Sequence, residues 1–268
     1  MTDPTEGGHG LGTIVVKIGG STLGSGDTTP EDLVELQNRG VRAVVVHGGG
    51  KVITEWMGKQ GVRPRFVRGL RFTDQSGLDI VVAVLTGLVN KNLVVSLGAL
   101  GARTIGISGV DGSMLQAVVK DPELGLVGSV VSVNTQPIEA VLNAGCIPVI
   151  APVAVQQVDG HRPGSSMLNV NADTAAGEIA AAIHAERLIF LTDVAGVLDS
   201  SHRLIPRLTE RQARGLMRSK IIDGGMVPKL EACLTALKGN CATHIVDGRR
   251  PGALVDALFG QASGTRIG

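Results

Sequence analysis

Short runs rich in valine and isoleucine alternate along this chain with longer segments that have the apolar spacing of helices. The expected strands are residues 13–18, 42–47, 103–108, 146–151, 187–191 and 242–246. The expected helices are residues 30–39, 51–60, 73–97, 172–184, 209–217 and 226–238, with a last helix from about Pro251. Buried parallel strands read as continuous apolar runs and need helical crossovers. The order therefore predicts an α/β fold, a three-layer αβα sandwich around an open, mainly parallel sheet.

Local signals refine this prediction. Thr29 and Thr73 are expected to cap the first and third helices. The turn Asp-Pro-Glu-Leu-Gly between residues 115–120 and 126–133 predicts an antiparallel hairpin. No linker or repeat interrupts the chain, so residues 13–268 are expected to form one folded unit of two lobes, with any hinge near the 172–187 segment.

Composition excludes several classes of function. Lys and Arg number 25 against 24 Asp and Glu, so no strong field favours nucleic acid or a membrane surface. Aromatic residues make up 2% of the chain, which leaves few platforms for stacking bases. Residues 1–12 are polar and glycine-rich, which predicts a disordered tail rather than a signal peptide. No uninterrupted apolar run reaches the ~18 residues of a membrane span, so we expect a cytoplasmic protein with buried, reduced cysteines.

Two glycine clusters follow the first two expected strands. Lys17-Ile18-Gly19-Gly20 ends the first, and His47-Gly48-Gly49-Gly50 ends the second and opens a helix. Backbone amides at such positions can bind phosphate, and ligands of open α/β sheets collect at the carboxyl ends of strands. A single cluster fits an ordinary turn equally well. Two together favour a phosphate site, whereas His47 beside them is interpreted as a structural residue.

Three further groups could bind anions. Arg71 lies beside an expected helix start and could hold a carboxylate through two hydrogen bonds. Asn169, Asn171 and Asp173 alternate in an extended segment and could line one wall, although Asn171 or Asp173 could equally cap the next helix. Lys229 follows Gly224 and Gly225 in the first turn of a helix, which suits charge on a phosphoryl group.

The segments VVKIGGS, VVVHGGG, FVRGLRFTD, NVNAD, LTDVAGVLD and GGMVPK, in this order, resemble the amino-acid kinase superfamily over nearly the whole chain. Within it the likeness to acetylglutamate kinases is strongest, since HGGG, GLRFTD and NVNAD occur in combination. The resemblance implies an amino-acid kinase fold with about eight strands. It implies an N-lobe (about 13–178) that binds acetylglutamate and dimerises, and a C-lobe (about 179–268) that binds ATP.

The resemblance also implies a role for each matching residue. Lys17 and Lys229 would stabilise charge on the transferring phosphoryl group, and Asp173 would orient both lysines. Acetylglutamate would be bound by Gly48, Gly49, Arg71, Asn169 and Asn171. The nucleotide would be bound by Gly19, Gly20, Thr192, Asp193, Gly196, Val197 and Leu198. Magnesium would be carried by ATP, so no protein metal ligand is expected.

Two alternatives remain open at this point. One is a kinase for carrier-protein-linked aminoadipate or glutamate, since Arg68 stands where family members often carry Asn, Asp or Lys and could contact an acidic partner. The other is a non-catalytic anion-binding relative, against which the intact lysines and Asp173 argue. Relatives that arginine inhibits carry a longer helix before the first strand, so the resemblance, with the short segment here, implies an arginine-insensitive homodimer. No sequence feature supports a nitrogen-signalling partner.

Overall fold

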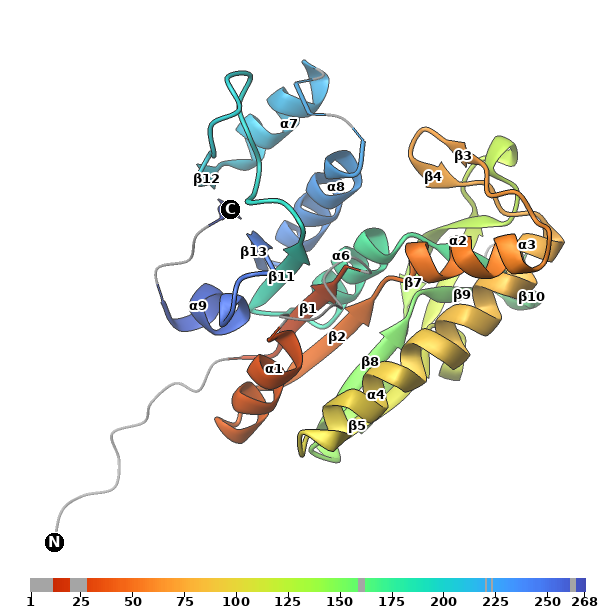
Figure 1. Ribbon diagram of the computed structural model, residues 1–268, viewed down its shortest axis with the longest axis horizontal. Coiled ribbons are helices and arrows are strands. Elements are labelled where there is room, and N and C mark those ends of the chain that lie inside the picture. The colour runs from red at the N-terminus through yellow and green to blue at the C-terminus, as the bar shows by residue number, and fades with distance from the viewer. Residues whose placement is uncertain (1–11, 20–27, 159–161, 220, 223, 261–263) are drawn as a thin grey trace, which may run out of the picture.

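An eight-stranded, mainly parallel sheet forms the middle layer of the molecule (Figure 1). The computed structural model describes residues 12–19, 28–158, 162–219, 221–222, 224–260 and 264–268. In spatial order the strands are β12 (Arg207–Leu208), β14 (Thr265–Ile267), β13 (Ala242–Asp247), β11 (Arg187–Thr192), β1 (Ile14–Ile18), β2 (Ala43–His47), β8 (Ile147–Ala151) and β5 (Thr104–Ser108). Within the sheet, β13 and β14 pair antiparallel, whereas the other neighbours run parallel. The predicted sandwich and its number of strands are confirmed.

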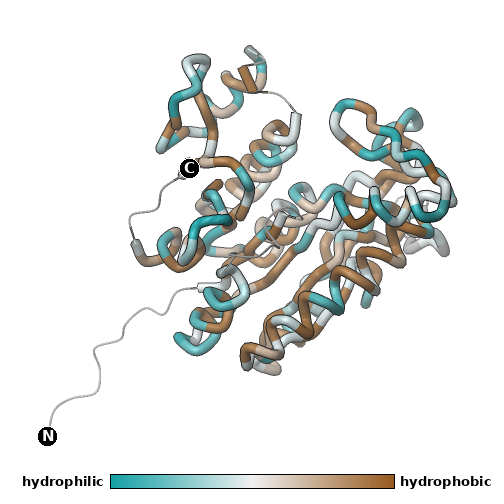
Figure 2. Tube along the Cα trace, in the orientation of Figure 1, coloured by the Kyte–Doolittle hydropathy of each residue, from teal (hydrophilic) through white to brown (hydrophobic). Residues whose placement is uncertain are grey.

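Helices cover both faces of this sheet. They are α1 (Thr29–Asn38), α2 (Gly50–Lys59), α3 (Gln75–Val82), α4 (Asn90–Ala99), α5 (Gln136–Asn143), α6 (Ala172–Ala182), α7 (Glu210–Arg218), α8 (Met226–Leu237) and α9 (Ala253–Phe259). Because successive strand residues point to opposite faces, Val15 packs in the core with α5, α6 and α8, and Val16 packs in the core with α1, α4 and α9. In Figure 2 the central strands are predominantly hydrophobic.

A second, four-stranded sheet lies beside the carboxyl end of β8. Its strands are β6 (Leu115–Val119), β7 (Val127–Val133), β9 (Val153–Val158) and β10 (Arg162–Val170), and their pairings close into a ring. The pair β6 and β7 is the predicted antiparallel hairpin. A small hairpin of β3 (Phe66–Val67) and β4 (Leu70–Arg71) lies near it, and single 3₁₀ turns are found at Asp111–Ser113 and Pro122–Leu124. The sequence analysis did not predict the strands β9, β10, β12 and β14, the β3–β4 hairpin or the helix α5.

Helices α3 and α4 form one continuous segment through the π-helical turn η1 (Ala83–Val89). Residues Gln75–Ala99 are long and apolar enough to cross a membrane by length and composition alone. However, Val81, Leu85, Leu93 and Leu97 are buried, and the segment packs on β5, β8 and β10. This packing is that of a core helix.

Both predicted helix caps were wrong. Thr29 lies inside the first turn of α1, preceded by Thr28. The cap of α3 is Asp74, whose carboxylate accepts a hydrogen bond from the Gly77 amide at 2.8 Å. Thr73 precedes the cap, and its amide donates to the carbonyl oxygen of Leu124. A carboxylate one residue later competes successfully for the same free amides.

Candidate active site

The carboxyl ends of β1 and β2 bring a lysine and a glycine-rich helix start together. Lys17 lies near the end of β1, and Gly49 is the residue that precedes α2. The first amides of a helix have no acceptor inside it and carry partial positive charge. A Cβ on Gly49 would come within 2.6 Å of the Leu85 side chain, so a larger residue here would require that side chain to shift.

Asp173 joins two lysines at the start of α6. Its Oδ1 lies 2.8 Å from Lys17 Nζ, and its Oδ2 lies 3.0 Å from Lys229 Nζ. Asn171 caps α6 by accepting hydrogen bonds from the amides of Asp173 and Thr174, so its side chain holds the helix start in place. Lys229 comes from the first turn of α8, which packs against α6. Residues distant in the sequence thus meet at one carboxylate.

The charges in this cluster support one another. Burial alone would raise the pKa of Asp173, but the adjacent ammonium groups of Lys17 and Lys229 together lower it below its ordinary value. The side chains of Lys17, Lys229 and Asp173 are 9%, 14% and 7% exposed. The cluster is therefore an ionised, nearly dry group with one net positive charge.

Arg71 forms the other polar end of the site. Its Nη2 donates to Gly50 O at 2.9 Å and to Thr54 Oγ1 at 2.8 Å, and its guanidinium lies over the Phe66 ring at 4.8 Å. Burial lowers the pKa of Arg71, although an arginine so far above neutral stays charged. The side chain is held in a fixed direction, as bidentate binding of a carboxylate requires.

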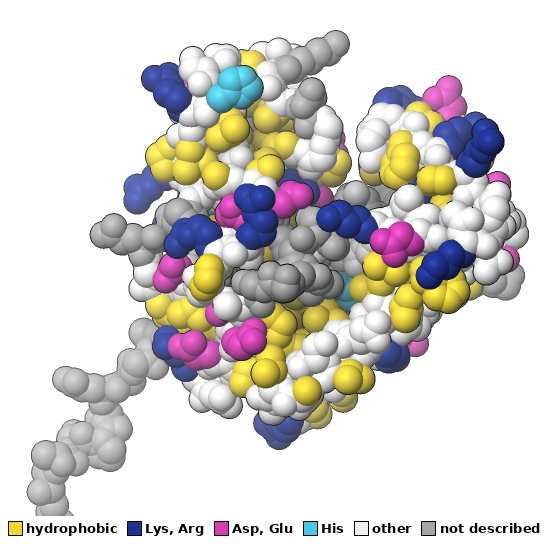
Figure 3. Space-filling view, in the orientation of Figure 1, with side chains coloured by type: hydrophobic (Ala, Val, Ile, Leu, Met, Phe, Trp, Pro, Cys, Tyr) yellow, Lys and Arg dark blue, Asp and Glu magenta, His cyan; other side chains and the backbone are white. Residues whose placement is uncertain are grey.

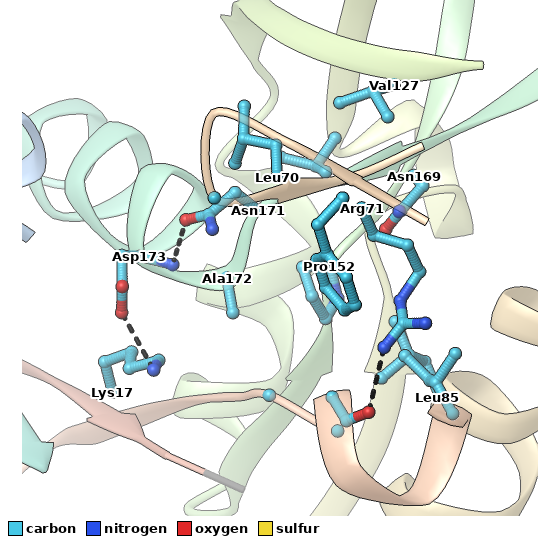
Figure 4. A pocket seen from close by; sticks show the side chains of 17 residues that line it. Lys17, Leu70, Arg71, Leu85, Val127, Pro152, Asn169, Asn171, Ala172 and Asp173 are labelled. Carbon is cyan, nitrogen blue, oxygen red and sulfur yellow. Dashed lines mark hydrogen bonds and ion pairs between the residues drawn. The ribbon is translucent and has the colours of Figure 1, made fainter. Parts of the chain in front are cut away.

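A cavity of about 230 Å³ connects these two ends. It is lined by Lys17, Gly48, Gly49, Gly50, Ile53, Phe66, Gly69, Leu70, Arg71, Leu85, Val127, Pro152, Asn169, Val170, Asn171, Ala172 and Asp173. In Figure 4, Lys17 and Asp173 lie on one side of the cavity and Arg71 on the other. Figure 3 shows the molecule hollowed between α8 and the β3–β4 hairpin, with both basic and acidic side chains near the hollow. The site therefore offers two separated cationic ends with apolar wall between them.

The predicted glycines fall into three groups. Gly48 and Gly49 line the cavity, while the Gly19 amide donates to Leu191 O at 3.2 Å and the Gly48 amide donates to Ile18 O at 3.0 Å. Those two amides thus donate to carbonyl oxygens of neighbouring strands. In the segment Gly48–Gly50, the first amide that could donate to a ligand is therefore that of Gly49. Gly20 and the expected tail up to residue 11 lie outside the described residues.

The five residues predicted from LTDVAGVL do not line this cavity. Thr192 ends β11, and Asp193 and Leu198 are exposed in the following loop. Gly196 has a φ of 144°, a conformation that favours glycine. Val197 is completely buried and its amide donates to Thr265 Oγ1 at 2.8 Å, so it supports the loop and offers neither side chain nor amide to a ligand.

Sequence reasoning missed the cavity wall made by the β3–β4 hairpin. Phe66 and Leu70 come from its two strands, which turn through Arg68 and Gly69 with φ values of 49° and 79°. A residue followed by glycine between two short strands is a signal for this kind of turn, but arginine is an unusual first residue for it. Thr54, one helical turn after Gly50, was missed as well.

The expectation for the cysteines needs one correction. Cys233 and Cys241 are buried, and burial raises the pKa of each thiol to about 12, whereas Cys146 is only partly buried.

Within the described part of the chain, no three His, Cys, Asp or Glu side chains are grouped to hold a metal ion. Asp173 is already occupied by two ammonium groups, so it does not suit a cation.

The fold and the site define a class of phosphoryl-transfer proteins. The family model described as the amino acid kinase family matches residues 12–247. The chain belongs to the amino acid kinase family.

Individual proteins of this family that are similar to this chain include acetylglutamate kinases. An acetylglutamate kinase of Cereibacter sphaeroides is 45% identical over 259 residues, which cover 95% of this chain and 87% of the relative. An acetylglutamate kinase of Dehalococcoides mccartyi is 41% identical over 254 residues, covering 95% and 93%. A crystal structure from Streptococcus mutans is 29% identical with a TM-score of 0.79, covering 95% of this chain and 98% of that one.

Proposed function

We propose that this chain transfers the γ-phosphoryl group of ATP to the γ-carboxylate of N-acetyl-L-glutamate, a step of arginine biosynthesis. A carboxylate oxygen forms a bond to the γ-phosphorus, and the bond from that phosphorus to the bridging oxygen of ADP breaks with its electron pair. The curated acetylglutamate kinases at 41% and 45% identity support this assignment. The observation that carries it in the structure is a single cavity with a cation at each end.

The two ends suit the two carboxylates of the substrate. Arg71 binds the α-carboxylate, with Asn169 beside it, and the reacting γ-carboxylate faces Lys17. Asn169 Nδ2 donates to Thr73 Oγ1 at 3.0 Å, which leaves its carbonyl oxygen to accept a hydrogen bond from the substrate. Asn171 positions α6 and takes part in binding mainly through that helix start.

Phosphoryl transfer between two anions needs positive charge more than it needs a base. The acceptor carboxylate is already ionised at neutral pH. Lys17, Lys229 and the amides at the start of α2 supply fixed positive charge where the equatorial oxygens of the phosphoryl group will lie. Asp173 holds both lysines in that position.

ATP is assigned to the carboxyl ends of β1 and β11, on the C-lobe side (about 179–268). Gly19, Gly20, Thr192, Asp193, Gly196 and Leu198 are the residues proposed to border it, and Val197 supports them from the core. Magnesium would be carried by ATP, so this chain is not expected to supply a metal ligand. It neutralises charge on the phosphates when present.

Arg68 no longer favours the carrier-linked substrate. Its Nη2 lies 2.5 Å from Asp121 Oδ2 and 3.2 Å from Glu123 Oε2 of the same chain. This basic side chain is therefore accounted for by acidic groups within the molecule.

We also propose a homodimer in the cytoplasm, formed through α4 and β5. Strand β5 ends the eight-stranded sheet, and a sheet edge offers unpaired backbone groups to a second copy. Ile105 on β5 is 39% exposed, and Val95 and Leu100 on the neighbouring helix α4 and at its end are 69% and 43% exposed. A two-fold contact would cover this apolar surface.

The proposed reaction is tested by ADP release with two compounds that differ only at the acceptor. N-acetyl-L-glutamate is expected to give ADP, and N-acetyl-L-glutamine, which keeps the α-carboxylate but lacks the acceptor, is expected to give none. Equal release with both compounds, or release with neither, would reject the proposed acceptor.

A further inference from the structure

His47 is a completely buried polar residue that the proposed reaction does not use. It ends β2 and directly precedes the glycines that line the cavity. Its Nδ1 lies 3.0 Å from the carbonyl oxygen of Gly48. Because a carbonyl oxygen can only accept, Nδ1 must carry the proton in this contact.

The opposite ring nitrogen is specified independently. Asn90 Nδ2 lies 3.1 Å from His47 Nε2 and donates to Val149 O at 2.9 Å. Lys91 Nζ donates to Asn90 Oδ1 at 3.1 Å, which fixes the direction of the amide. His47 Nε2 is thus an acceptor, and the ring is neutral with its hydrogen on Nδ1. Burial lowers the pKa of His47 to about 4, which keeps the ring neutral at physiological pH.

This contact determines the direction of one peptide group. The Gly48–Gly49 peptide bond is trans, so its carbonyl and its N–H point in opposite directions. The carbonyl is drawn toward His47 in the core, and the Gly49 N–H is therefore turned outward, where Gly49 lines the cavity. The flanking groups are fixed too, since the Gly48 amide donates to Ile18 O at 3.0 Å and Gly49 O accepts from Ile53 at 2.9 Å.

The hydrogen bond from His47 restrains a peptide group that lies between two glycines. Two successive glycines allow the peptide between them to turn over at little steric cost. We infer that His47 is a positioning residue, whose Nδ1–H holds the Gly48 carbonyl and so keeps the Gly49 amide directed at the transferring phosphoryl group. The inference rests on the proposed function for what the amide binds, but the hydrogen-bond arrangement stands apart from it.

Two amide variants separate the two sides of the ring. His47→Asn places an N–H where Nδ1 stands and loses the contact with Asn90. His47→Gln places its amide where Nε2 stands and loses the donor to Gly48. Each variant deletes one buried hydrogen bond, so both should lower Tm to a similar extent. A purely structural histidine would give similar activity in both variants.

We expect a separation in kcat instead. His47→Asn should keep kcat within about 3-fold of the wild type, whereas His47→Gln should lose on the order of 10²- to 10³-fold, the range for loss of one hydrogen-bond donor to a developing charge. KM for ATP should change little in either, because the amide acts mainly on the transferring group. Equal losses in the two variants, or a larger loss in His47→Asn, would overturn the inference.

The tautomer is read without turnover, from the long-range proton–nitrogen spectrum of ¹⁵N-histidine-labelled protein. The His47 resonances, assigned by their absence in His47→Gln, should show the hydrogen on Nδ1 at pH 7. A hydrogen on Nε2 would overturn the inference. A wild-type protein that phosphorylates nothing would reject the proposed function alone, and the tautomer would then decide the hydrogen-bond arrangement.

Discussion

Lys229 Nζ, on α8, lies 3.0 Å from Asp173 Oδ2, on α6, while the other oxygen of the same carboxylate holds Lys17. Replacing either lysine by alanine removes positive charge that acts on the transferring phosphoryl group. We expect kcat to fall on the order of 10²- to 10³-fold in Lys17→Ala and Lys229→Ala, with the fold intact. Steady-state kinetics and circular dichroism measure the two effects.

The matched control is Lys238→Ala, which changes a lysine at the other end of the same helix. It should leave kcat unchanged. Turnover of Lys229→Ala at the wild-type level would remove the role assigned to that lysine.

Asp173→Asn should destabilise the protein. The substitution leaves two largely buried ammonium groups without their counter-charge, and removing one partner of a buried ion pair costs about 3 kcal/mol or more. Urea unfolding measures the free energy. In a Lys229→Gln background the same substitution should cost less, because one uncompensated charge is already gone. Equal costs in both backgrounds would show that Asp173 and Lys229 do not interact.

Arg71→Ala should raise KM for acetylglutamate by about 10- to 100-fold, because a charge-assisted hydrogen bond to a carboxylate is worth roughly 1.5–3 kcal/mol. KM for ATP should stay near the wild-type value. Arg63→Ala is the control, since Arg63 is an exposed arginine of the same segment. Similar changes in KM for both substrates would indicate general damage to the site rather than loss of a carboxylate ligand.

Acidification should destabilise the protein through two buried histidines. Burial lowers the pKa of His47 and of His244 to about 4, from an ordinary value of 6.5. Between these values the unfolded chain binds protons that the folded chain does not. Stability therefore falls as pH is lowered from about 6.5 to about 4, by up to ~3 kcal/mol for each histidine.

The variant His244→Gln tests this pH dependence. Urea unfolding at pH 7 and pH 5 should show a smaller loss of stability in His244→Gln than in the wild type. The exposed His202→Gln serves as the control and should retain the wild-type loss. A wild-type stability that does not change between the two pH values would contradict the prediction.

Val95→Glu should convert the proposed dimer to a monomer by placing charge on the exposed face of α4. Sedimentation velocity measures the change. Lys59→Glu on α2 is the control for added negative charge and should sediment as the wild type. A wild-type protein that sediments as a monomer would reject the dimer, and an unchanged dimer in Val95→Glu would place its contact elsewhere.

The sequence predicted six of the eight strands of the main sheet because those six are continuous apolar runs, and it missed the short strands β12 and β14. Val44, Val45 and Val46 are all completely buried, and in an α/β chain a run of this kind predicts a buried parallel strand. Strand β10 was missed because its segment is polar and contains Pro163 and Gly164. Its partners come from distant parts of the chain, and a local pattern does not carry that information.

The cation cluster was predicted only through a family likeness. Nothing near Lys17 in the sequence signals that Lys229 shares its counter-ion, because α6 and α8 meet through tertiary packing. The sequence left Asn171 and Asp173 open as caps of α6, and the structure shows that Asn171 is the cap. By contrast, the sequence could not predict the contacts of His47. Its partner Asn90 lies on α4, more than forty residues later in the chain, and the two meet only through tertiary packing.

The most direct test of the account is ATP-dependent acyl phosphate formation, trapped with hydroxylamine, from three acceptors. These are N-acetyl-L-glutamate, free L-glutamate and N-acetyl-L-2-aminoadipate. We predict strong hydroxamate formation from N-acetyl-L-glutamate and little from the other two. A preference for the aminoadipate compound, or no product from any of them while ATP still binds, would contradict the proposed function.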